Sequence, residues 1–413
     1  MPSLIVLRHA LLIDGTGREP LPDATVVVEG RRIKEVGAGA PGVLPATAQV
    51  LDVRGHALLP GLIDAHVHVC AVDANLMEQH RRYPASLVTV KAVQVLAETL
   101  AQGFTTVRDA GGADWGLQQA QVQGLIAAPR LLISGRALSQ TGGHGDMRCR
   151  TERGPLQVDS CSFGVVCDGV DEVRRAAREQ LRQGANQLKV MASGGAMSPT
   201  DELHHTQFGV EELQAAVAEA RAAGTYVMAH AYTPASIANC LAAGVRSIEH
   251  GNFLDAATAQ AMRQAGAFLV PTLATYELLA RHGKDYGVPE ANLRKIREAL
   301  ATGQEAVRLA AAAGVRIASG SDLLGPMQSQ RAVELELKAE VLTPMGALVA
   351  TTRTNAELLG LDHELGTVEA GKLADLLVVR GNPLEDIRVL QAYRESLLLI
   401  MQEGRLYKNT LGG

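Results

Sequence analysis

The chain lacks several features that would place it in a specialised class of protein. Aromatic residues make up only 3% of its 413 residues, and no apolar stretch approaches the roughly 20 residues that a membrane span needs. No basic run exceeds a few residues and the net charge is −5, so we expect neither a nucleic-acid partner nor a membrane partner. Hydrophobic residues make up 47%, the balance of an ordinary globular protein whose core is built from Ala, Leu and Val.

Cysteine is also scarce. There are 5 cysteines, an odd number, and their spacings match no disulfide framework or zinc knuckle. We therefore expect a reducing compartment, with the cytoplasm as the default location. Cys149, Cys161 and Cys167 share one segment, which leaves a local bridge as an alternative. Arg8 and His9 interrupt the first apolar run, which argues against a signal peptide unless one has been removed.

Glycines punctuate the middle of the chain at regular points. Each of these glycines ends an Ala/Leu-rich helical pattern, because a glycine readily adopts the left-handed conformation that stops a helix. The helix-ending positions are Gly103, Gly184, Gly224, Gly244, Gly266 and Gly314. Each precedes a short β-type run, and the alternation of helix, glycine and strand is typical of parallel βα units.

Eight β-type runs favour a closed (β/α)8 TIM barrel within the α/β class. The runs are Leu58–Val67, Phe104–Arg108, Arg130–Ser134, Ala185–Met191, Thr225–Ala229, Val245–Ile248, Ala267–Thr272 and Val315–Ser319. A doubly wound open sheet is the alternative. No Gly-rich phosphate loop follows any strand, and the polar residues gather at the ends of many strands, which argues against that alternative.

The two ends of the chain differ from the middle. Both hold short β-type runs, such as Ala24–Glu29 and Leu376–Val379. We predict one small β-sandwich domain built from residues 1–57 and 366–413, beside a barrel domain formed by residues 58–365. Two separate β caps are the alternative arrangement.

The most informative motif is a pair of histidines at the end of the first apolar run. Side chains on a strand alternate between its two faces, so His66 and His68 point to the same side. Two imidazoles on one face can share a metal ion. A lone His-x-His pair is weak evidence, and the prediction of a metal site depends on further ligands elsewhere in the chain.

Four further candidate ligands follow later strands, where barrel active sites lie. His230 and His250 each end a strand, and Asp322 follows the eighth. Lys189 lies inside an apolar strand, where a bare ammonium is costly to bury. We interpret Lys189 as carboxylated by carbon dioxide. The alternatives without a catalytic role are a lysine that reaches solvent, histidines of the core, and an aspartate that caps a helix.

Four histidines, a carboxylated lysine and an aspartate can hold two divalent metal ions. Such a pair deprotonates a bridging water molecule and polarises the carbonyl that the resulting hydroxide attacks. Nitrogen and oxygen ligands without thiolate suit zinc, although manganese or cobalt also bind such sites.

These motifs make the chain recognisable over nearly its whole length. It resembles the metal-dependent amidohydrolase superfamily in the segments Leu11–Gly17, Pro60–His68 and Ala370–Asp375. The resemblance implies a (β/α)8 barrel that carries the metals, with a β-sandwich built from both termini.

Within that superfamily, the chain resembles the branch of Xaa-Pro dipeptidases, N-acyl amino acid carboxypeptidases and ochratoxin-hydrolysing amidases. The segments behind this narrower match are Thr141–Asp146, Ala192–Pro199 and His230–Tyr232. The resemblance implies that the metal ligands are His66, His68 and Asp322 for one ion, His230 and His250 for the other, and Lys189 as the bridge. It also implies that His144 hydrogen-bonds the substrate carbonyl and that Tyr232 receives the substrate's terminal carboxylate. A loop histidine and a packed aromatic ring are the alternatives for these two residues.

The expected function is hydrolysis of the amide bond of N-acyl amino acids or dipeptides, ochratoxin A included, with release of a C-terminal amino acid. A metal-bridging hydroxide would attack, and Asp322 would carry its proton to the leaving amine. Hydrolysis of cyclic amides, lactones or phosphotriesters is the alternative, and a non-enzymatic scaffold is a third. We expect a small-molecule substrate, and the resemblance implies a homo-oligomer.

Two polar segments are expected to form loops beside the site. Residues 146–168 would form a lid, and residues 198–208 a second mobile loop. His204 and His205 lie in the second segment but do not directly follow a strand, so we expect loop contacts and no metal binding from them.

Overall fold

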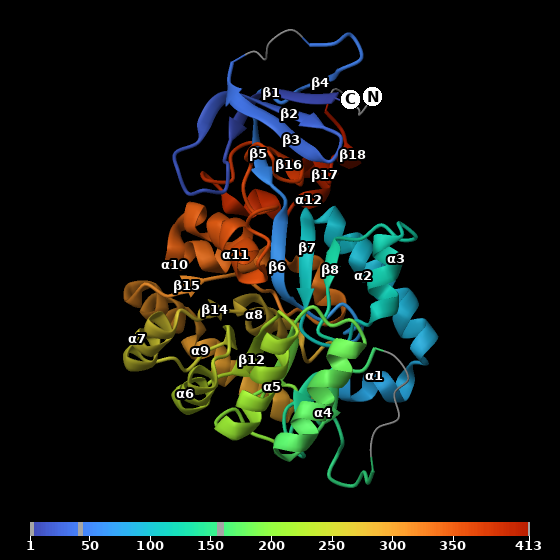
Figure 1. Ribbon diagram of the computed structural model, residues 1–413, viewed down its shortest axis with the longest axis vertical. Helices are drawn as coiled ribbons and strands as arrows, with labels where there is room; N and C mark the ends of the chain where they lie inside the picture. Colours follow the sequence, from blue (N-terminus) through green and yellow to red (C-terminus); the bar gives the residue numbers. More distant parts are fainter. Residues whose placement is uncertain (1–3, 40–43, 155–160, 412–413) are drawn as a thin grey trace. The chain divides into compact units, whose positions relative to one another are not determined.

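The computed structural model describes residues 4–39, 44–154 and 161–411 (Figure 1). The chain divides into two compact units, which we call the terminal unit and the barrel unit. The terminal unit comprises Met1–Asp64, Ala97–Thr106 and Gln330–Gly413, and the barrel unit comprises Ala65–Leu96 and Val107–Ser329. The domain boundaries after residues 57 and 365 stay a prediction.

The terminal unit is built on one 8-stranded sheet in the order β18-β17-β16-β5-β1-β2-β3, with β4 paired to β1. The strands are β1 (Leu4–Leu12), β2 (Leu21–Glu29), β3 (Arg32–Ala38), β4 (Gln49–Asp52), β5 (His56–Pro60), β16 (Leu376–Arg380), β17 (Leu397–Gln402) and β18 (Arg405–Asn409). Leu7 and Val26, from the beginning of the chain, share one buried cluster with Leu376 and Leu399, from its end. Strands from both ends of the chain therefore share one sheet and one core, as the predicted β-sandwich of both termini requires.

Short helices complete the terminal unit. They are α10 (Val333–Val349), η2 (Ala350–Thr354), α11 (Asn355–Leu359), η3 (Ile387–Leu390) and α12 (Tyr393–Ser396). Asn355 follows η2, and its side-chain amide donates to the Ile63 carbonyl at 2.6 Å. This hydrogen bond ties the helical segment to the strand that leads into the barrel.

The barrel unit confirms the (β/α)8 TIM-barrel prediction. Its eight strands are β6 (Leu62–Val67), β7 (Phe104–Asp109), β8 (Arg130–Leu132), β11 (Leu188–Met191), β12 (Val227–Ala231), β13 (Ser247–His250), β14 (Phe268–Val270) and β15 (Arg316–Ile317). The strands form two sheets, β6-β7-β8 and β10-β9-β11-β12-β13-β14-β15. Backbone bonds from Ala65 to Ser319 (2.9 Å) and from Asn186 to Ile133 (2.7 Å) join the ends of these sheets. The strands thereby close into a ring.

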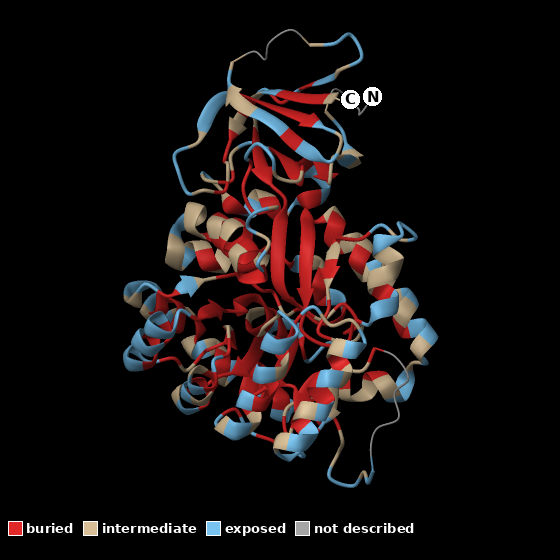
Figure 2. Ribbon diagram, in the orientation of Figure 1, coloured by how far each residue is buried: buried red, intermediate tan, exposed pale blue. Residues whose placement is uncertain are grey.

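Helices alternate with the barrel strands, and the buried residues in Figure 2 concentrate on the strands and on parts of the helices around them. The helices are α1 (Leu76–Arg82), α2 (Ala85–Ala101), α3 (Trp115–Val122), α4 (Gly169–Arg182), α5 (Val210–Ala222), α6 (Pro234–Ala243), α7 (Ala256–Ala265), α8 (Leu273–His282), α9 (Glu290–Ala313) and η1 (Gly325–Gln330). Gly244, Gly266 and Gly314 have φ values of 87°, 67° and 75° and cap α6, α7 and α9, as the sequence predicts. Among the described residues, no helix combines the length and apolar character needed to cross a bilayer.

The first predicted barrel strand is wrong in one respect, because the run Leu58–Val67 splits at Gly61. Its first part belongs to β5, which pairs with β16 and β1 in the terminal sheet. Only the second part, β6, enters the barrel. A Cβ atom on Gly61 would lie 2.2 Å from the Thr105 hydroxyl oxygen, so the close approach of β7 requires glycine at this point.

The predicted lid segment, residues 146–168, contains a strand as well as loops. β9 (Ala137–Ser139) and β10 (Gly164–Val166) pair in parallel, which extends the barrel sheet beside β11. Residues 155–160 of this segment lie outside the described residues. The alternative of a local disulfide is wrong, because none of Cys149, Cys161 and Cys167 forms a disulfide bond.

Replacing Gly61 with alanine is expected to destabilise the protein by about 1–3 kcal/mol, since the new methyl group overlaps the buried Thr105 side chain. Urea unfolding followed by circular dichroism measures this loss. Gly37→Ala is the matched control, because a Cβ atom there has no neighbour within 4 Å. The control should change the free energy of unfolding by less than about 0.5 kcal/mol. Equal effects of the two variants would contradict the proposed overlap.

Candidate metal centre

All six predicted metal-binding side chains line one cavity in the barrel unit. They are His66, His68, Lys189, His230, His250 and Asp322. His66 and His68 come from the end of β6, Lys189 from β11, His230 from β12, His250 from the end of β13 and Asp322 from the segment after β15. The structure therefore brings residues from five parts of the barrel to one place.

One half of this cluster is a compact set of three ligand-type groups. Single ligand atoms of His66, His68 and Asp322 lie within 4.8 Å of one another. Asp322 Oδ1 is 3.6 Å from His66 Nε2 and 3.4 Å from His68 Nε2. The Lys189 ammonium lies 3.5 Å from the same His66 nitrogen, so four groups meet around one point.

The other half is formed by His230 and His250. Their ring centroids are 4.5 Å apart, and the His250 ring is 5.0 Å from the ring of His66. His250 Nδ1 also lies 3.9 Å from Asp322 Oδ2. The two halves are thus continuous, as a pair of neighbouring metal ions would require.

Hydrogen bonds behind three of the rings fix their orientation. The partners, each 2.8 Å from Nδ1, are the Glu249 carboxylate for His66, the Gly111 carbonyl for His68 and the Thr272 hydroxyl for His250. In His230 the held nitrogen is Nε2, which lies 3.0 Å from the Gly194 carbonyl. One nitrogen of each ring is thereby held, which is the usual arrangement of metal-binding histidines.

Burial sets the protonation of these groups. It lowers the pKa of His68 to about 3 and holds the pKa values of His66, His230 and His250 well below the ordinary value. At neutral pH the four imidazoles are therefore uncharged, which is the form that binds metals. Burial also lowers the pKa of Lys189 to about 8. The donor set, uncharged imidazoles with one carboxylate and a lysine whose pKa is lowered, fits divalent cations.

Two of the candidate ligands have a backbone conformation that is unusual for residues other than glycine. His250 has a φ of 75° and Asp322 a φ of 52°. Such conformations cost about 1–3 kcal/mol each and persist where the surrounding structure imposes them. The Asp322 amide donates to the His66 carbonyl at 2.9 Å. No helix begins at Asp322 in the described chain, and η1 starts only at Gly325, so the helix-cap alternative is wrong.

The two residues predicted to contact substrate face the same cavity. The His144 ring stacks on His230 with centroids 4.3 Å apart, and the Tyr232 ring stacks on His250 at 5.3 Å. The Tyr232 hydroxyl lies 2.6 Å from the Tyr276 hydroxyl. The two side chains predicted to contact substrate therefore pack directly against two of the predicted metal ligands.

A family model described as Amidohydrolase family matches residues 57–402. The chain belongs to the amidohydrolase family. It is a hydrolase that acts on amide bonds, and this family is generally dependent on a pair of metal ions.

Individual relatives of this amidohydrolase lie in the predicted branch. An ochratoxinase from Aspergillus niger is 33% identical over 434 aligned residues, which cover 98% of this chain and 87% of the relative. A solved prolidase in complex with N-methylphosphonate-L-proline is 45% identical, covers 98% of this chain and 100% of its own, and superposes with a TM-score of 0.94. A solved Xaa-Pro dipeptidase with bound methionine is 31% identical, with coverages of 98% and 100% and a TM-score of 0.88.

A buried ion pair, Arg108 with Glu249, lies next to the site and was not predicted from the sequence. The Arg108 guanidinium donates to both oxygens of the Glu249 carboxylate at 3.0 and 3.1 Å, and neither side chain is exposed. The Ser247 hydroxyl donates to the same carboxylate at 2.6 Å. Glu249 also holds His66. The signal was available, because Glu249 is a charged residue inside an apolar strand and directly precedes His250.

The two loop histidines of residues 198–208 stay outside the cavity, as expected. The exposed His204 imidazole lies 2.7 Å from the Glu298 carboxylate and stacks on the Phe253 ring. His205 Nδ1 accepts a hydrogen bond from the backbone amide of Glu202 at 3.3 Å. Both histidines contact neighbouring loops and helices, and neither lines the cavity that contains the six candidate ligands.

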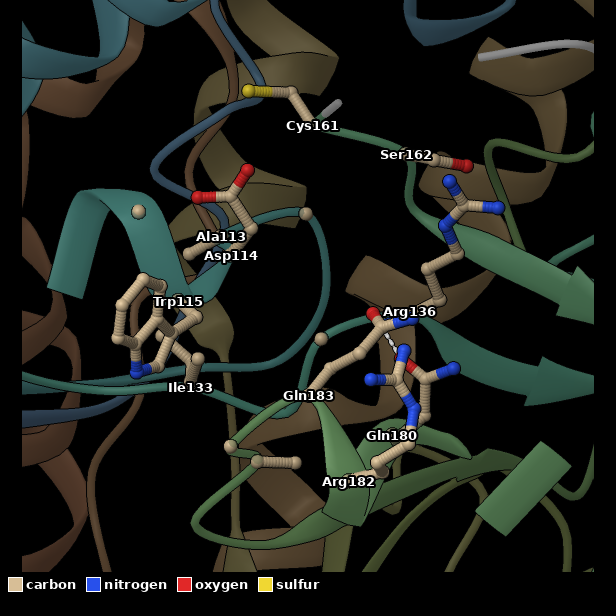
Figure 3. Close-up of a pocket in the computed structure, with 15 residues that line it drawn as sticks. Ala113, Asp114, Trp115, Ile133, Arg136, Cys161, Ser162, Gln180, Arg182 and Gln183 are labelled. Carbon is tan, nitrogen blue, oxygen red and sulfur yellow. Dashed lines mark hydrogen bonds between the residues drawn. The ribbon is translucent and has the colours of Figure 1, made fainter. Parts of the chain in front are cut away.

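Cavity size alone does not locate this site. A larger cavity of about 420 Å³ lies in the same unit, and Figure 3 shows Trp115, Arg136 and Arg182 among its lining side chains. None of the predicted site residues lines it. The cavity that contains the histidine cluster measures about 50 Å³. The chemistry of the side chains therefore identifies the candidate site.

Proposed function

We propose that this amidohydrolase cleaves the amide bond of N-acyl amino acids or dipeptides and releases the C-terminal amino acid. The observation that carries the proposal is the convergence of six ligand-type side chains with His144 and Tyr232 in one cavity. The ochratoxinase, prolidase and Xaa-Pro dipeptidase relatives support it. Ochratoxin A is included among the proposed substrates. We also propose that the partner of this protein is a small-molecule substrate and that the protein is a homo-oligomer in the cytoplasm.

We propose that the cluster holds two divalent metal ions, with zinc as the native metal. His66, His68 and Asp322 would bind one ion, and His230 and His250 the other. Lys189, carboxylated by carbon dioxide, would bridge them. Carboxylation requires an uncharged amine, and burial lowers the pKa of Lys189 to about 8, which makes that form accessible. When bound, the ions would activate a water molecule and polarise the scissile carbonyl.

The chain's own residues would handle the proton and the substrate. Asp322 Oδ1, beside His66 and His68, would accept the proton of the attacking water and pass it to the leaving amine. His144 would contact the carbonyl oxygen through Nε2 and oppose the charge that develops there. Tyr232 would donate to the terminal carboxylate, and burial raises its pKa, so the phenol keeps its proton.

Apolar side chains around the cluster suit the rest of such a substrate. The apolar and aromatic residues of the cavity include Leu76, Met191, Met197, Tyr276, Leu279, Ile296 and Leu324. Methionine side chains adapt to groups of different shape. The lining carries no arginine and, apart from Lys189, no lysine, so we propose apolar acyl groups and apolar leaving amino acids.

The zinc-loaded protein is expected to release amino acids from a panel of N-acyl amino acids and dipeptides. The panel contains Phe, Pro, Leu, Arg and Lys leaving groups, with ochratoxin A as a bulky aromatic amide. Released amine, quantified by chromatography, reports the activity. Removal of metal by a chelator should abolish the release, and added zinc should restore it.

Two results would contradict the proposal. Release that survives complete metal removal would exclude the metal-dependent mechanism. If protein that contains two metal ions releases no amino acid, we would instead propose cyclic amides, lactones or phosphotriesters as substrates. The same panel design would test them. Faster release of Arg or Lys than of Phe or Leu would contradict the proposed preference for apolar leaving groups.

A further inference from the structure

A chain of buried polar groups leads away from His144. His144 Nδ1 lies 2.9 Å from the Ser198 hydroxyl oxygen. That hydroxyl also contacts the Asp201 carboxylate and the Gly195 carbonyl, the latter at 3.0 Å. The second Asp201 oxygen accepts from the Gln207 side-chain amide at 2.7 Å, and the other amide atom of Gln207 accepts from the His144 backbone at 2.9 Å. The chain therefore returns to the residue where it starts.

The loop that carries Ser198 is held in place by helix α9. The Lys295 ammonium donates to the carbonyls of Gly195, Ser198 and Asp201 at 2.7, 2.9 and 3.1 Å. The Asn292 amide adds a bond of 2.7 Å to the Ala196 carbonyl. These bonds use only backbone atoms of the loop, so the backbone position does not depend on the Ser198 hydroxyl. The Ser198 hydroxyl is therefore not needed to hold the loop backbone in place.

Lys295 also supplies the charge that balances Asp201. Its ammonium lies 3.8 Å from Asp201 Oδ1, and both side chains are almost completely buried. Burial raises the pKa of the Asp201 carboxyl, and the bonds from Ser198 and Gln207 and the charge of Lys295 oppose that shift. Lys295 and the Ser198 hydroxyl thus meet the same oxygen of the Asp201 carboxylate.

One nitrogen of the His144 ring is held by this chain of polar groups. Nδ1 lies 2.9 Å from the Ser198 hydroxyl oxygen, and that hydroxyl in turn contacts Asp201. Among the described residues no hydrogen bond reaches His144 Nε2, and the ring lines the cavity.

We propose that Ser198 and Asp201 are positioning residues that hold His144 through Nδ1 and keep Nε2 as the nitrogen that meets the substrate. The inference rests on the proposed function for the role of His144 in the reaction. This relay of contacts fixes the plane of the His144 ring and the nitrogen that faces the cavity.

Substitutions separate this role from a general structural one. Ser198→Ala is expected to lower kcat by about 10- to 100-fold with less than about a threefold change in KM, because the ring loses its orientation while the cavity stays intact. Ser198→Thr, which keeps the hydroxyl, should recover most of the rate. Asp201→Asn removes the charge and should lower kcat similarly. Thr200→Ala is the matched control, a half-buried hydroxyl of the same loop outside the relay, and should leave both constants unchanged.

Nitrogen NMR of the histidine-labelled protein tests the hydrogen bond at His144 Nδ1 directly and needs no substrate. The Nδ1 resonance of His144 is expected to shift between the wild type and Ser198→Ala, because this nitrogen loses its partner. An identical Nδ1 resonance in both proteins would overturn the proposal, as would an unchanged kcat in a folded Ser198→Ala variant. Failure of the proposed function would instead appear as an inactive wild type, and the NMR result would still decide the relay.

Discussion

Lys189→Ala protein is expected to bind fewer than two metal ions per chain and to lose amide hydrolysis by on the order of a thousandfold or more. The Lys189 ammonium lies 3.5 Å from His66 Nε2 and is almost completely buried, so no solvent-exposed group can replace it. Removing the side chain takes away the proposed bridge and leaves the two histidine sets with uncharged nitrogens and one carboxylate between them.

Metal content and a carbamate signal test this expectation separately. Elemental analysis after zinc loading counts the ions per chain in the wild type and in Lys189→Ala. Carbon NMR of protein exchanged with carbon-13 bicarbonate should show a carbamate carbonyl in the wild type and none in the variant. The first measurement tests the ligand role and the second tests carboxylation, so either can fail alone.

Lys338→Met is the matched control for losing a buried ammonium. Lys338 is fully buried on α10 in the terminal unit, where it contacts the Glu334 carboxylate. Its loss should reduce stability, because it removes a charged contact of the buried Glu334 carboxylate, and should leave the metal count unchanged. A Lys189→Ala protein with two ions and an undiminished rate would exclude Lys189 from the centre.

Glu249→Ala is expected to lower the free energy of unfolding by about 3–5 kcal/mol. The substitution leaves the Arg108 guanidinium buried without a carboxylate, since both oxygens of Glu249 face it at 3.0 and 3.1 Å. Breaking a buried pair from one side costs more than the pair itself contributes, because the remaining charge stays out of water. The variant also removes the group that orients His66.

Urea unfolding followed by circular dichroism measures this effect. Glu219→Ala serves as the control, because Glu219 pairs with the largely exposed Arg178 on the surface of α4 and α5. Surface pairs contribute about 0–1 kcal/mol, so the control should stay within that range. Zinc affinity of Glu249→Ala, measured by competition with a chromogenic chelator, should fall by about 10- to 100-fold. Equal stability losses in both variants would contradict a buried ion pair.

Local sequence patterns were sufficient for the frame of the protein. The helix-ending glycines predicted the βα alternation, because a left-handed residue after a helix is a property of a few neighbouring residues. Strand alternation placed His66 and His68 on one face, and their ring centroids are 5.4 Å apart. The assignments of Lys189 and His230 to strand positions depended on the same short-range regularities.

Local patterns failed where one segment serves two neighbours. The run Leu58–Val67 is continuous in hydrophobicity, yet Gly61 divides it between the terminal sheet and the barrel. The chain requires glycine at this point because the Thr105 side chain fills the space that a Cβ atom would occupy. Thr105 is distant from Gly61 in the sequence. A pattern of hydrophobic residues does not record such a partner.

The sequence by itself determined which strands carry the ligand-type side chains and at which end of each strand they lie. Only the tertiary structure decided how these side chains are supported. Arg108 and Glu249 belong to different strands, and Ser198 and Asp201 reach His144 from a separate loop, so their roles depend on contacts between segments 54 to 141 residues apart. Hydrogen bonds of this kind arise when the barrel closes, because closure brings strand ends together irrespective of their separation along the chain.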